Sequence, residues 1–274
     1  MDRRSTPFSG RFALTSLRGQ VEATFTDGET ASVLWPLADL LSRPDGPRDR
    51  QVLLGDALTV IDLRDDHVFV QAAKDGYCGW LDAASIGPAI MPTHWVAAPA
   101  SHLYTGPKVQ ARTLSALPMG AKVAVTGTEG SFAETSMGFV PLVHLRALHD
   151  RPADPVTVAE TLLGVPYLWG GNSAAGLDCS GLVQTALLAC GLPCPGDSDQ
   201  QQGLGTMLDD QTLLQRGDLL FWTGHVAMVA DADRIIHANG QTMSVAYEPT
   251  AVAIARIKAQ GGGPVTARRR LSLT

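Results

Sequence analysis

The sequence predicts a multi-domain protein in which two small all-β barrels precede an α+β domain. Three observations support this fold class. The chain has 274 residues, near the length at which a single hydrophobic core gives way to several. Its 28 glycines and 17 prolines exceed the usual share and indicate many turns between short strands. The first 150 residues alternate as strands do, whereas helical spacing begins only after residue 154.

Residues 1–21 are expected to form an N-terminal segment, followed by a first barrel over residues 22–90. Its expected strands are short apolar runs separated by turn residues: 52–54, 58–61, 68–71 and 77–81. A fainter version of the same pattern predicts a second barrel over residues 93–148. In both halves a Leu-Gly or Met-Gly turn precedes a Val-rich strand and a Gly-aromatic strand. We therefore interpret the two barrels as diverged repeats.

A domain break is predicted at residues 151–155, where two prolines interrupt strand pairing. The third domain is expected over residues 154–260. Residues 156–163 carry apolar side chains at helical spacing, with Asp154 placed as the N-cap and Pro155 at the first helical position. A second helix is predicted from Cys179 to Cys190, where Gly191 would end it.

The rest of the third domain reads as an antiparallel sheet. Its expected strands are residues 218–222, 225–230, 234–237 and 245–248. Helices first and a sheet second is the order of an α+β domain. Residues 261–274 carry no strong pattern, and we expect them to form a solvated C-terminal tail.

Charge and hydropathy exclude several classes of protein. The net charge of −6 and the pI near 5.6 argue against a nucleic-acid or anionic-membrane partner, which needs a basic face. No apolar run reaches the roughly 18 residues that cross a bilayer, and residues 1–7 show no secretory signal. Four cysteines are too few for a disulfide scaffold of this size. We expect a cytoplasmic protein, whose oligomeric state remains open.

Cys179 is the first candidate for chemistry. It lies at the start of a predicted helix, where unpaired amides and the helix dipole favour a thiolate. Ser180 and Gly181 are small, so a substrate can approach, and the Cys179 amide is placed to hold an oxyanion. The alternative is a buried structural cysteine.

A nucleophilic cysteine needs a base, and the base needs an orienting partner. His225 begins one predicted strand and His237 ends the next, 12 residues later (237 − 225). If these strands pair as a hairpin, their far ends lie together. His225 is then the expected base, and His237 is expected to fix its tautomer. The alternative is that each histidine is an ordinary strand residue.

Metal binding is a competing interpretation of the same residues. Cys190 and Cys194 with His225 and His237 would supply two thiolates and two imidazoles, but the histidines lack the usual spacing of three to five residues. The chain also has no Gly-x-Ser-x-Gly elbow, no phosphate loop and no Gly-x-Gly-x-x-Gly motif. We therefore expect neither a metal nor a cofactor.

Taken together, these motifs make the C-terminal part resemble the NlpC family of cell-wall cysteine peptidases. The matching stretches are Pro166 to Gly171, Asp178 to Val183, Arg216 to Trp222, Gly224 to Val229, and His237-Ala238. They span about residues 154–260, and as an ordered set they are highly specific. The strand-rich N-terminal part, with Asp75 to Trp80, resembles the bacterial SH3-like barrels that accompany this domain.

The resemblance implies a papain-like catalytic fold and a Cys-His-polar triad, here Cys179, His225 and His237. It also implies cleavage of the amide between γ-D-glutamate and an L-diamino acid, either diaminopimelate or lysine, in peptidoglycan stem peptides. In members with paired SH3-like barrels, the first barrel limits the substrate to peptides with a free N-terminal L-alanine.

Several substrate contacts follow from the resemblance. Asp178 would hold the free amine, because a charge-assisted bond to an α-ammonium distinguishes free from blocked termini. Tyr167 and Ser180 would contact the substrate, and Tyr77 of the first barrel would close the same pocket. Alternatively, Asp178 caps the following helix, while Tyr167 and Tyr77 only pack.

The chain departs from the family pattern at Gly196. Related sequences often carry an arginine there, before an Asp-Ser pair, where it would meet the glutamate carboxylate. Either another group takes that charge, or the glutamate is recognised more loosely, through Ser198. The departure bears on substrate preference more than on the type of reaction.

We expect an endopeptidase that trims released muropeptides for recycling. A thioester on Cys179 can also pass to an amine, so an amidase or an acyl or peptidyl transferase is an alternative. A second alternative is a module that only binds cell-wall peptides. The intact Cys179, His225 and His237 argue against an inert domain.

Overall fold

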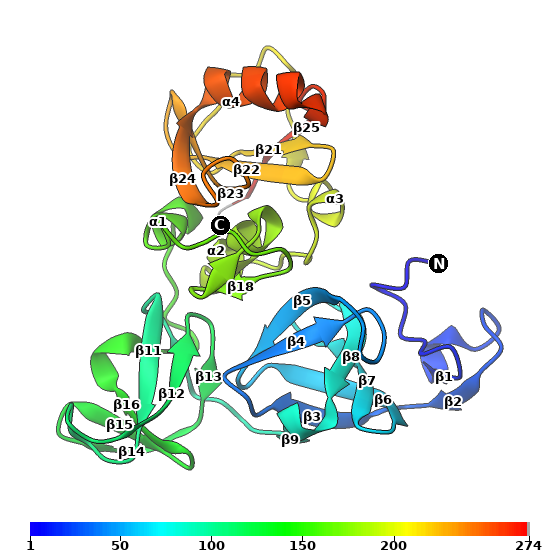
Figure 1. The fold of residues 1–274 in the computed structure, drawn as a ribbon, viewed down its shortest axis with the longest axis vertical. Coiled ribbons are helices and arrows are strands. Elements are labelled where there is room, and N and C mark those ends of the chain that lie inside the picture. Colours follow the sequence, from blue (N-terminus) through cyan, green and yellow to red (C-terminus); the bar gives the residue numbers. More distant parts are fainter. Residues whose placement is uncertain (273–274) are drawn as a thin grey trace. The chain divides into compact units, whose positions relative to one another are not determined.

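The computed structural model describes residues 1–272 and divides the chain into two compact units, Met1–Asp150 and Arg151–Thr274. The division falls beside the break predicted at residues 151–155. Each unit has hydrophobic cores of its own. Figure 1 shows that strands make up the first unit, whereas the second combines helices and a sheet.

The first strand body of unit one is a seven-stranded sheet with the order β5-β4-β8-β7-β6-β3-β9. The strands are β3 (Glu29–Val33), β4 (Leu37–Leu41), β5 (Arg48–Leu53), β6 (Ala57–Arg64), β7 (His67–Ala72), β8 (Cys78–Asp82) and β9 (Ile86–Pro88). Alternate side chains such as Val68 and Val70 enter the core, as period-2 patterning requires. The runs predicted at 52–54, 58–61, 68–71 and 77–81 lie mainly in β5 to β8.

The N-terminal segment also has structure. β1 (Phe12–Leu14) pairs in parallel with β2 (Thr24–Thr26), and a 3₁₀ turn, η1 (Thr15–Leu17), lies between them. Arg11 donates to the buried Asp62 carboxylate of β6, which joins this segment to the first strand body.

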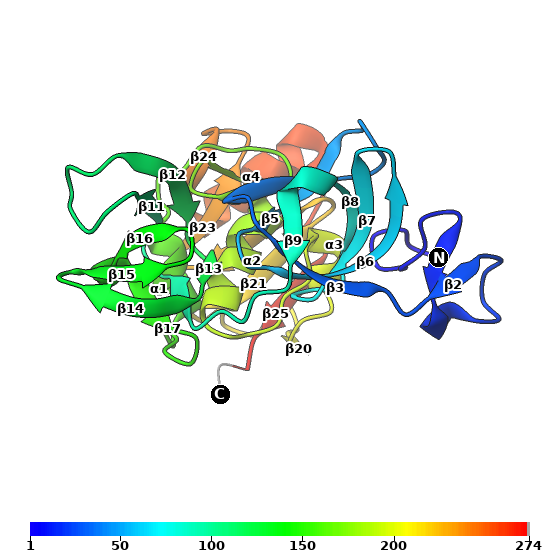
Figure 2. The same ribbon diagram turned by 90° about the horizontal axis from the view of Figure 1, so that it is seen from below.

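The second strand body contains a five-stranded sheet, β12-β11-β16-β15-β14, and a three-stranded sheet, β13-β10-β17. Figure 2 shows β14, β15 and β16 side by side. The strands are β10 (His94–Val96), β11 (Ala100–Tyr104), β12 (Thr113–Pro118), β13 (Lys122–Val123), β14 (Val125–Glu129), β15 (Phe132–Thr135), β16 (Gly138–Pro141) and β17 (Leu145–Ala147). Lys122 Nζ lies 2.7 Å from Asp56 Oδ1, an ion pair that links the two strand bodies.

Unit two begins with the two predicted helices. α1 (Pro155–Glu160) is capped by Asp154, whose side chain accepts from the Val156 amide, and Pro155 is its first residue. α2 (Cys179–Ala189) is buried over most of its surface, with Leu182, Val183 and Leu187 among its buried residues, and ends before Gly191, which has a φ of +76°. A short hairpin of β18 (Asn172–Ser173) and β19 (Gly176–Leu177) precedes α2, and α3 (Ser198–Gln201) follows it.

The sheet of unit two has six strands in the order β20-β25-β21-β22-β23-β24. They are β20 (Thr206–Met207), β21 (Leu219–Trp222), β22 (His225–Val229), β23 (Arg234–Asn239), β24 (Ser244–Pro249) and β25 (Ala267–Arg270). α4 (Thr250–Ile257) covers one face, where Ala253 and Ile257 pack on Leu220, Trp222 and Val229. α2 contacts β22 and β23, and Figure 1 places it on the side of the sheet away from α4.

The expectation of a solvated tail over residues 261–274 is wrong for residues 267–270, which form the strand β25. β25 pairs with both β20 and β21, and Arg270 donates to the buried Asp218 carboxylate at 2.7 Å. This strand was not predicted because three successive arginines interrupt the alternation of apolar and polar residues that is typical of a strand. Residues 273–274 of the predicted tail lie outside the described residues. Within residues 1–272, no helix is both long and apolar enough to span a bilayer.

Candidate active site

The candidate nucleophile lies where the sequence places it, at the first position of α2. Cys179 is buried, and its Sγ lies 4.0 Å from the carbonyl oxygen of Gly224, in the turn before β22. The N-terminus of α2 is therefore brought against the end of the strand that carries His225. The helix dipole at this first turn favours a negative charge on the sulfur.

Asp178 holds the start of α2 in place. One of its oxygens accepts from the Gly181 amide at 2.6 Å and from the Ser180 hydroxyl at 3.1 Å. The other oxygen accepts from the Gly170 amide at 2.9 Å. The side chain is only 6% exposed, so the helix-cap role foreseen for Asp178 is confirmed. The two bonds to the helix and the one to the preceding loop fix the Cys179 backbone relative to that loop.

Tyr167 lies in the loop that Asp178 anchors. Its backbone amide donates to the Met243 carbonyl at 2.8 Å, and it bridges to Leu177 of β19. The ring is half-buried. The loop, the β18–β19 hairpin and the turn between β23 and β24 are thus tied together on the N-terminal side of Cys179.

The two predicted histidines come together. His225 begins β22, His237 lies in β23, and His225 Nε2 is 3.0 Å from His237 Nδ1. His237 is 1% exposed, whereas His225 is partly exposed. Burial lowers the pKa of His225 to about 3, helped by His237 and Arg256, and lowers the pKa of His237 to about 4. Both imidazoles are neutral at neutral pH, as a general base requires.

Two further residues complete this group, and sequence reasoning missed them. His237 Nε2 lies 3.1 Å from Glu248 Oε2, in β24. Arg256 of α4 donates to both oxygens of that carboxylate, at 2.8 and 2.7 Å. The bidentate guanidinium holds the pKa of Glu248 below its usual range. Ala246 is the strand partner of His237, and Glu248 lies two residues further along β24. The sequence could have indicated Glu248 only if this register of the hairpin had been known.

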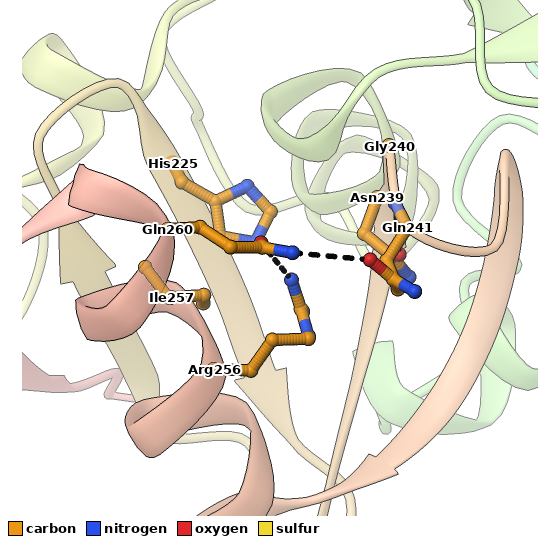
Figure 3. Close-up of a pocket in the computed structure, with 7 residues that line it drawn as sticks. All are labelled: His225, Asn239, Gly240, Gln241, Arg256, Ile257 and Gln260. Carbon is orange, nitrogen blue, oxygen red and sulfur yellow. Dashed lines mark hydrogen bonds between the residues drawn. The ribbon is translucent and has the colours of Figure 1, made fainter.

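A pocket of about 240 Å³ opens beside His225. Figure 3 shows that it lies between α4 and the turn after β23. Several of its lining side chains are hydrogen-bonded to one another: Arg256 donates to Gln260 at 2.9 Å, and Gln260 donates to Gln241 at 3.1 Å. The full lining is His225, Asn239, Gly240, Gln241, Arg256, Ile257 and Gln260. A group bound here would lie next to the ring of the candidate base.

The remaining predicted contacts lie in different places. Ser180 is buried next to Asp178, and Ser198 begins α3 in the same unit. Gly196, which stands where an arginine was considered, is buried shortly before α3. Tyr77 belongs to unit one, where its side chain packs in the core of the first strand body.

The cysteines do not assemble a metal site with the histidines. No disulfide joins any two of the four cysteines, and the Cys194 thiol donates to the Pro195 carbonyl at 3.5 Å. Over residues 1–272, no three side chains of His, Cys, Asp or Glu gather as metal ligands do, so the set considered for zinc is not formed. Burial raises the pKa of the Cys190 thiol to about 11 and that of Cys78 to about 12.

Comparison with protein families matches two parts of the chain. Residues 164–257 match the model of the NlpC/P60 family, and residues 40–86 match that of the bacterial dipeptidyl-peptidase Sh3 domain. The first range contains Cys179, His225, His237 and Glu248. The second range lies within the first strand body.

Curated relatives and a solved structure extend the similarity to most of the chain. A γ-D-glutamyl-L-lysine dipeptidyl-peptidase of Bacillus cereus is 27% identical over 246 residues, covering 73% of this chain and 70% of the relative. Dipeptidyl-peptidase 6 of Lysinibacillus sphaericus is 26% identical over 237 residues, covering 76% and 87%. The crystal structure of an NlpC/P60 family protein from Bacillus cereus superposes with a TM-score of 0.74, at 22% identity, over 88% of this chain and 99% of that one. The structural match concerns the fold alone.

Proposed function

We propose that this cysteine peptidase, whose catalytic domain is of the NlpC/P60 type, hydrolyses the amide between γ-D-glutamate and an L-diamino acid in peptidoglycan stem peptides. The observation that carries the proposal is the approach of a helix-terminal thiol to the turn directly before His225, whose ring is hydrogen-bonded to that of His237. Cys179 is the nucleophile, His225 the base and His237 the residue that orients the base.

The reaction proceeds through a thioester. The His225 ring nitrogen that does not face His237 takes the thiol proton, and the thiolate attacks the γ-glutamyl carbonyl carbon. The backbone amide of Cys179 donates to the oxyanion. The C–N bond then breaks as protonated His225 gives its proton to the leaving amine. Water attacks the thioester as His225 accepts a proton from it, the C–S bond breaks to release the thiolate, and His225 returns the proton to the sulfur.

Two features support the peptide specificity. The relatives are named for γ-D-glutamyl-L-lysine dipeptides and for dipeptidyl-peptidase activity. The pocket beside His225 offers room for the leaving diamino acid, because the group that protonates the leaving amine forms its wall. Diaminopimelate and lysine are both candidates for this position.

A free N-terminal L-alanine is the second part of the proposed specificity. The Asp178 carboxylate lies at the first turn of α2, directly before Cys179, where its negative charge would attract the α-ammonium of a free N-terminus. Tyr167, Ser180 and Ser198 are the proposed further contacts. We also interpret the second strand body as a second SH3-like barrel, and we assign Tyr77 of the first barrel to closure of the amine pocket.

The proposed role is recycling of released wall peptides in the cytoplasm. A stem peptide has a free N-terminal amine only after its release from the glycan. None of the four cysteines forms a disulfide with another, as is usual in a reducing compartment. Peptidoglycan-derived peptides are thus the expected partners, and neither nucleic acid nor a membrane is needed.

Mass spectrometry of peptide digests tests the proposal. L-Ala-γ-D-Glu-diaminopimelate and its L-lysine counterpart are incubated with the wild-type chain and with Cys179→Ala. We expect release of L-Ala-D-Glu by the wild type alone. Cleavage that persists in Cys179→Ala would exclude the proposed nucleophile. Intact peptides after incubation with wild type would exclude this substrate class.

A further inference from the structure

Four side chains of unit two form one unbroken hydrogen-bonded series that begins on α4 and ends at the candidate base. Arg256 donates to Glu248, Glu248 contacts His237, and His237 contacts His225. We propose that Glu248, held by Arg256, is a positioning residue that sets the tautomers of both histidines and so leaves Nδ1 of His225 free to act as the base. The inference rests on the proposed triad.

The directions of the hydrogen bonds follow from one fact, that an ionised carboxylate can only accept. Because Glu248 accepts, the proton on neutral His237 must sit on Nε2. His237 Nδ1 is then an acceptor, so the proton on neutral His225 must sit on Nε2 and point toward it. His225 Nδ1 is left without a proton. The charge state of one carboxylate therefore decides which nitrogen of a ring two bonds away can take the thiol proton.

The geometry of the sheet makes this series specific. In the β23–β24 ladder, Ala246 is the direct partner of His237, and Glu248 lies two residues further along. Side chains two residues apart on a strand share a face, so Glu248 reaches His237 along the diagonal. The His237 side chain has no exposed surface, whereas water could otherwise accept from Nε2. A protein group must therefore satisfy that nitrogen, and Glu248 does so.

Arg256 keeps Glu248 both ionised and in place. Its Nε and Nη2 bind the two carboxylate oxygens, and its Nη1 is held by Gln260. This fork leaves the carboxylate one orientation, with Oε2 toward His237. The charged groups that face His237 are thus Glu248 and Arg256, and those that act on His225 are Arg256, Glu248 and, when it is protonated, His237.

The same series also assists the charged intermediate state. When His225 takes the thiol proton it becomes an imidazolium, and its Nε2–H bond to His237 strengthens. His237 passes this polarisation to the carboxylate through its own Nε2–H, without giving up a proton. Glu248 therefore favours the thiolate–imidazolium pair as well as the correct neutral tautomer.

Glu248→Gln is the decisive substitution because an amide of nearly the same shape can donate as well as accept. If the amide donates to His237 Nε2, the whole series reverses and places a proton on His225 Nδ1. We expect kcat to fall on the order of 10²-fold or more with little change in KM, as when an orienting carboxylate elsewhere becomes an amide. Glu248→Asp keeps a carboxylate and should recover part of the loss.

Two readouts do not depend on any substrate. Nitrogen-15 NMR of the histidine rings in the full chain should show protonated Nε2 at both His225 and His237 in the wild type, and a mixture of tautomers in Glu248→Gln. The rate of alkylation of Cys179 by iodoacetamide, followed by peptide mapping, should reach half its maximum at a pH about one unit higher in Glu248→Gln.

Glu160→Gln is the matched control. Glu160 also binds an arginine, Arg216, through both oxygens and accepts from Tyr247. Within residues 1–272, the further hydrogen bonds of Arg216 end at Asp154, Thr157 and Ala230 rather than at His225. We expect wild-type tautomers and alkylation in this variant. Unchanged tautomers in Glu248→Gln would overturn the proposal, as would an equal effect of Glu160→Gln. If the wild type cleaves no stem peptide while the tautomers respond to Glu248→Gln, the positioning role stands and only the proposed substrate fails.

Discussion

At the scale of single residues, burial determines the chemistry of the site. His237 is closed off from water, and its neighbours on the same face of the sheet are His225 and Glu248. Desolvation disfavours the charged imidazole, so both histidines stay neutral where an exposed histidine would begin to titrate. A neutral imidazole can act as a general base, but keeping both histidines neutral lowers the stability of the folded chain at acid pH.

The first prediction concerns that cost. The pKa values of His225 and His237 are about 3 and 4 in the folded chain and 6.5 ordinarily. Between pH 6.5 and about 4, these histidines are protonated in the unfolded chain but stay neutral in the folded chain. Stability is therefore complete above pH 6.5 and falls as the pH drops toward 4, by up to about 1.4 kcal/mol per pH unit for each histidine. Glu248, whose folded pKa is lowered, adds a loss of the same sign at more acid pH.

Urea unfolding of the wild type and of His237→Gln at pH 7, 6 and 5 measures this effect. The slope of the unfolding free energy against pH should be smaller in the variant, because glutamine does not titrate and His237 no longer adds to the difference in bound protons between the unfolded and folded chains. The comparison uses the slope and not the unfolding free energy itself, because the substitution also changes packing and so shifts that free energy at every pH. Parallel slopes would contradict the assignment of His237 as a buried neutral imidazole.

The sequence was informative about residues whose position is local and silent about those whose position depends on register. Cys179 was recognised from the helix that begins at it, and Asp178 from the capping rule. Glu248 and Arg256 were not recognised, because their contacts depend on which residue of β24 faces His237. That register depends on the turn at residues 240–243, where Met243 has a φ of +50°.

At the scale of elements, the sheet of unit two depends on a strand that comes late in the chain. β25 lies between β20 and β21 and carries Arg270 to Asp218. α4, which was also missed, consists largely of alanine and β-branched residues that favour no single element in isolation. The conformations of β25 and α4 therefore depend on tertiary packing, and the hydrophobic periodicity of the sequence did not predict them.

The second prediction tests β25. A chain ending after residue 263 lacks the strand, exposes the edge of β21 and leaves the buried Asp218 carboxylate without Arg270. We expect loss of soluble protein, or a large drop in melting temperature. A chain ending after Arg270 is the control and should remain soluble and active. Equal behaviour of the two truncations would show that β25 contributes little.

The third prediction concerns the turn after β23. A Cβ placed on Gly240 meets no atom within 4 Å, and the glycine does not need a left-handed φ. Gly240→Leu therefore places a side chain into the pocket beside His225 without a backbone clash. KM for the diamino-acid peptide should rise about tenfold or more, while Cys179 alkylation stays as in the wild type.

Gly106→Leu, in the second strand body, is the matched control, since a Cβ there meets only Ala111 at 3.9 Å. Its KM should equal that of the wild type. An unchanged KM in Gly240→Leu would place the leaving diamino acid elsewhere.

At the scale of the whole molecule, the order of strand-rich and helical parts was predictable because composition changes sharply near residue 151. The match of residues 40–86 to a bacterial Sh3 domain and of residues 164–257 to NlpC/P60 agrees with that order. The proposed selection of a free N-terminus rests on Asp178, and Tyr77 is a further candidate. Hydrophobic periodicity cannot test either role, so substitutions are needed.

The fourth prediction makes that test. Asparagine caps helices as well as aspartate, so Asp178→Asn can keep the bonds to Ser180 and Gly181 through its one oxygen. It loses the bond from the Gly170 amide and the charge that would hold an ammonium, and the ratio of two substrates separates the second effect from the first. The ratio of kcat/KM for the free peptide to that for the N-acetylated peptide should fall by about tenfold or more. Tyr77→Phe keeps the ring in its core and should lower the same ratio. Tyr104→Phe, in the second strand body, should leave it unchanged.

An unaltered ratio in Asp178→Asn would restrict Asp178 to its cap. An unaltered ratio in Tyr77→Phe alone would restrict Tyr77 to packing and leave the amine contact to the catalytic unit.

The place of β25 in its sheet has a consequence for how the protein is made. Translation delivers β20 and β21 more than forty residues before the strand that separates them, so the growing chain passes through a stage in which β21 has a bare flank (267 − 222 = 45). Until β25 emerges, that flank can pair with any passing strand, including one from a neighbouring ribosome on the same message. Slow decoding near residue 260 would prolong this stage and favour aggregation during synthesis.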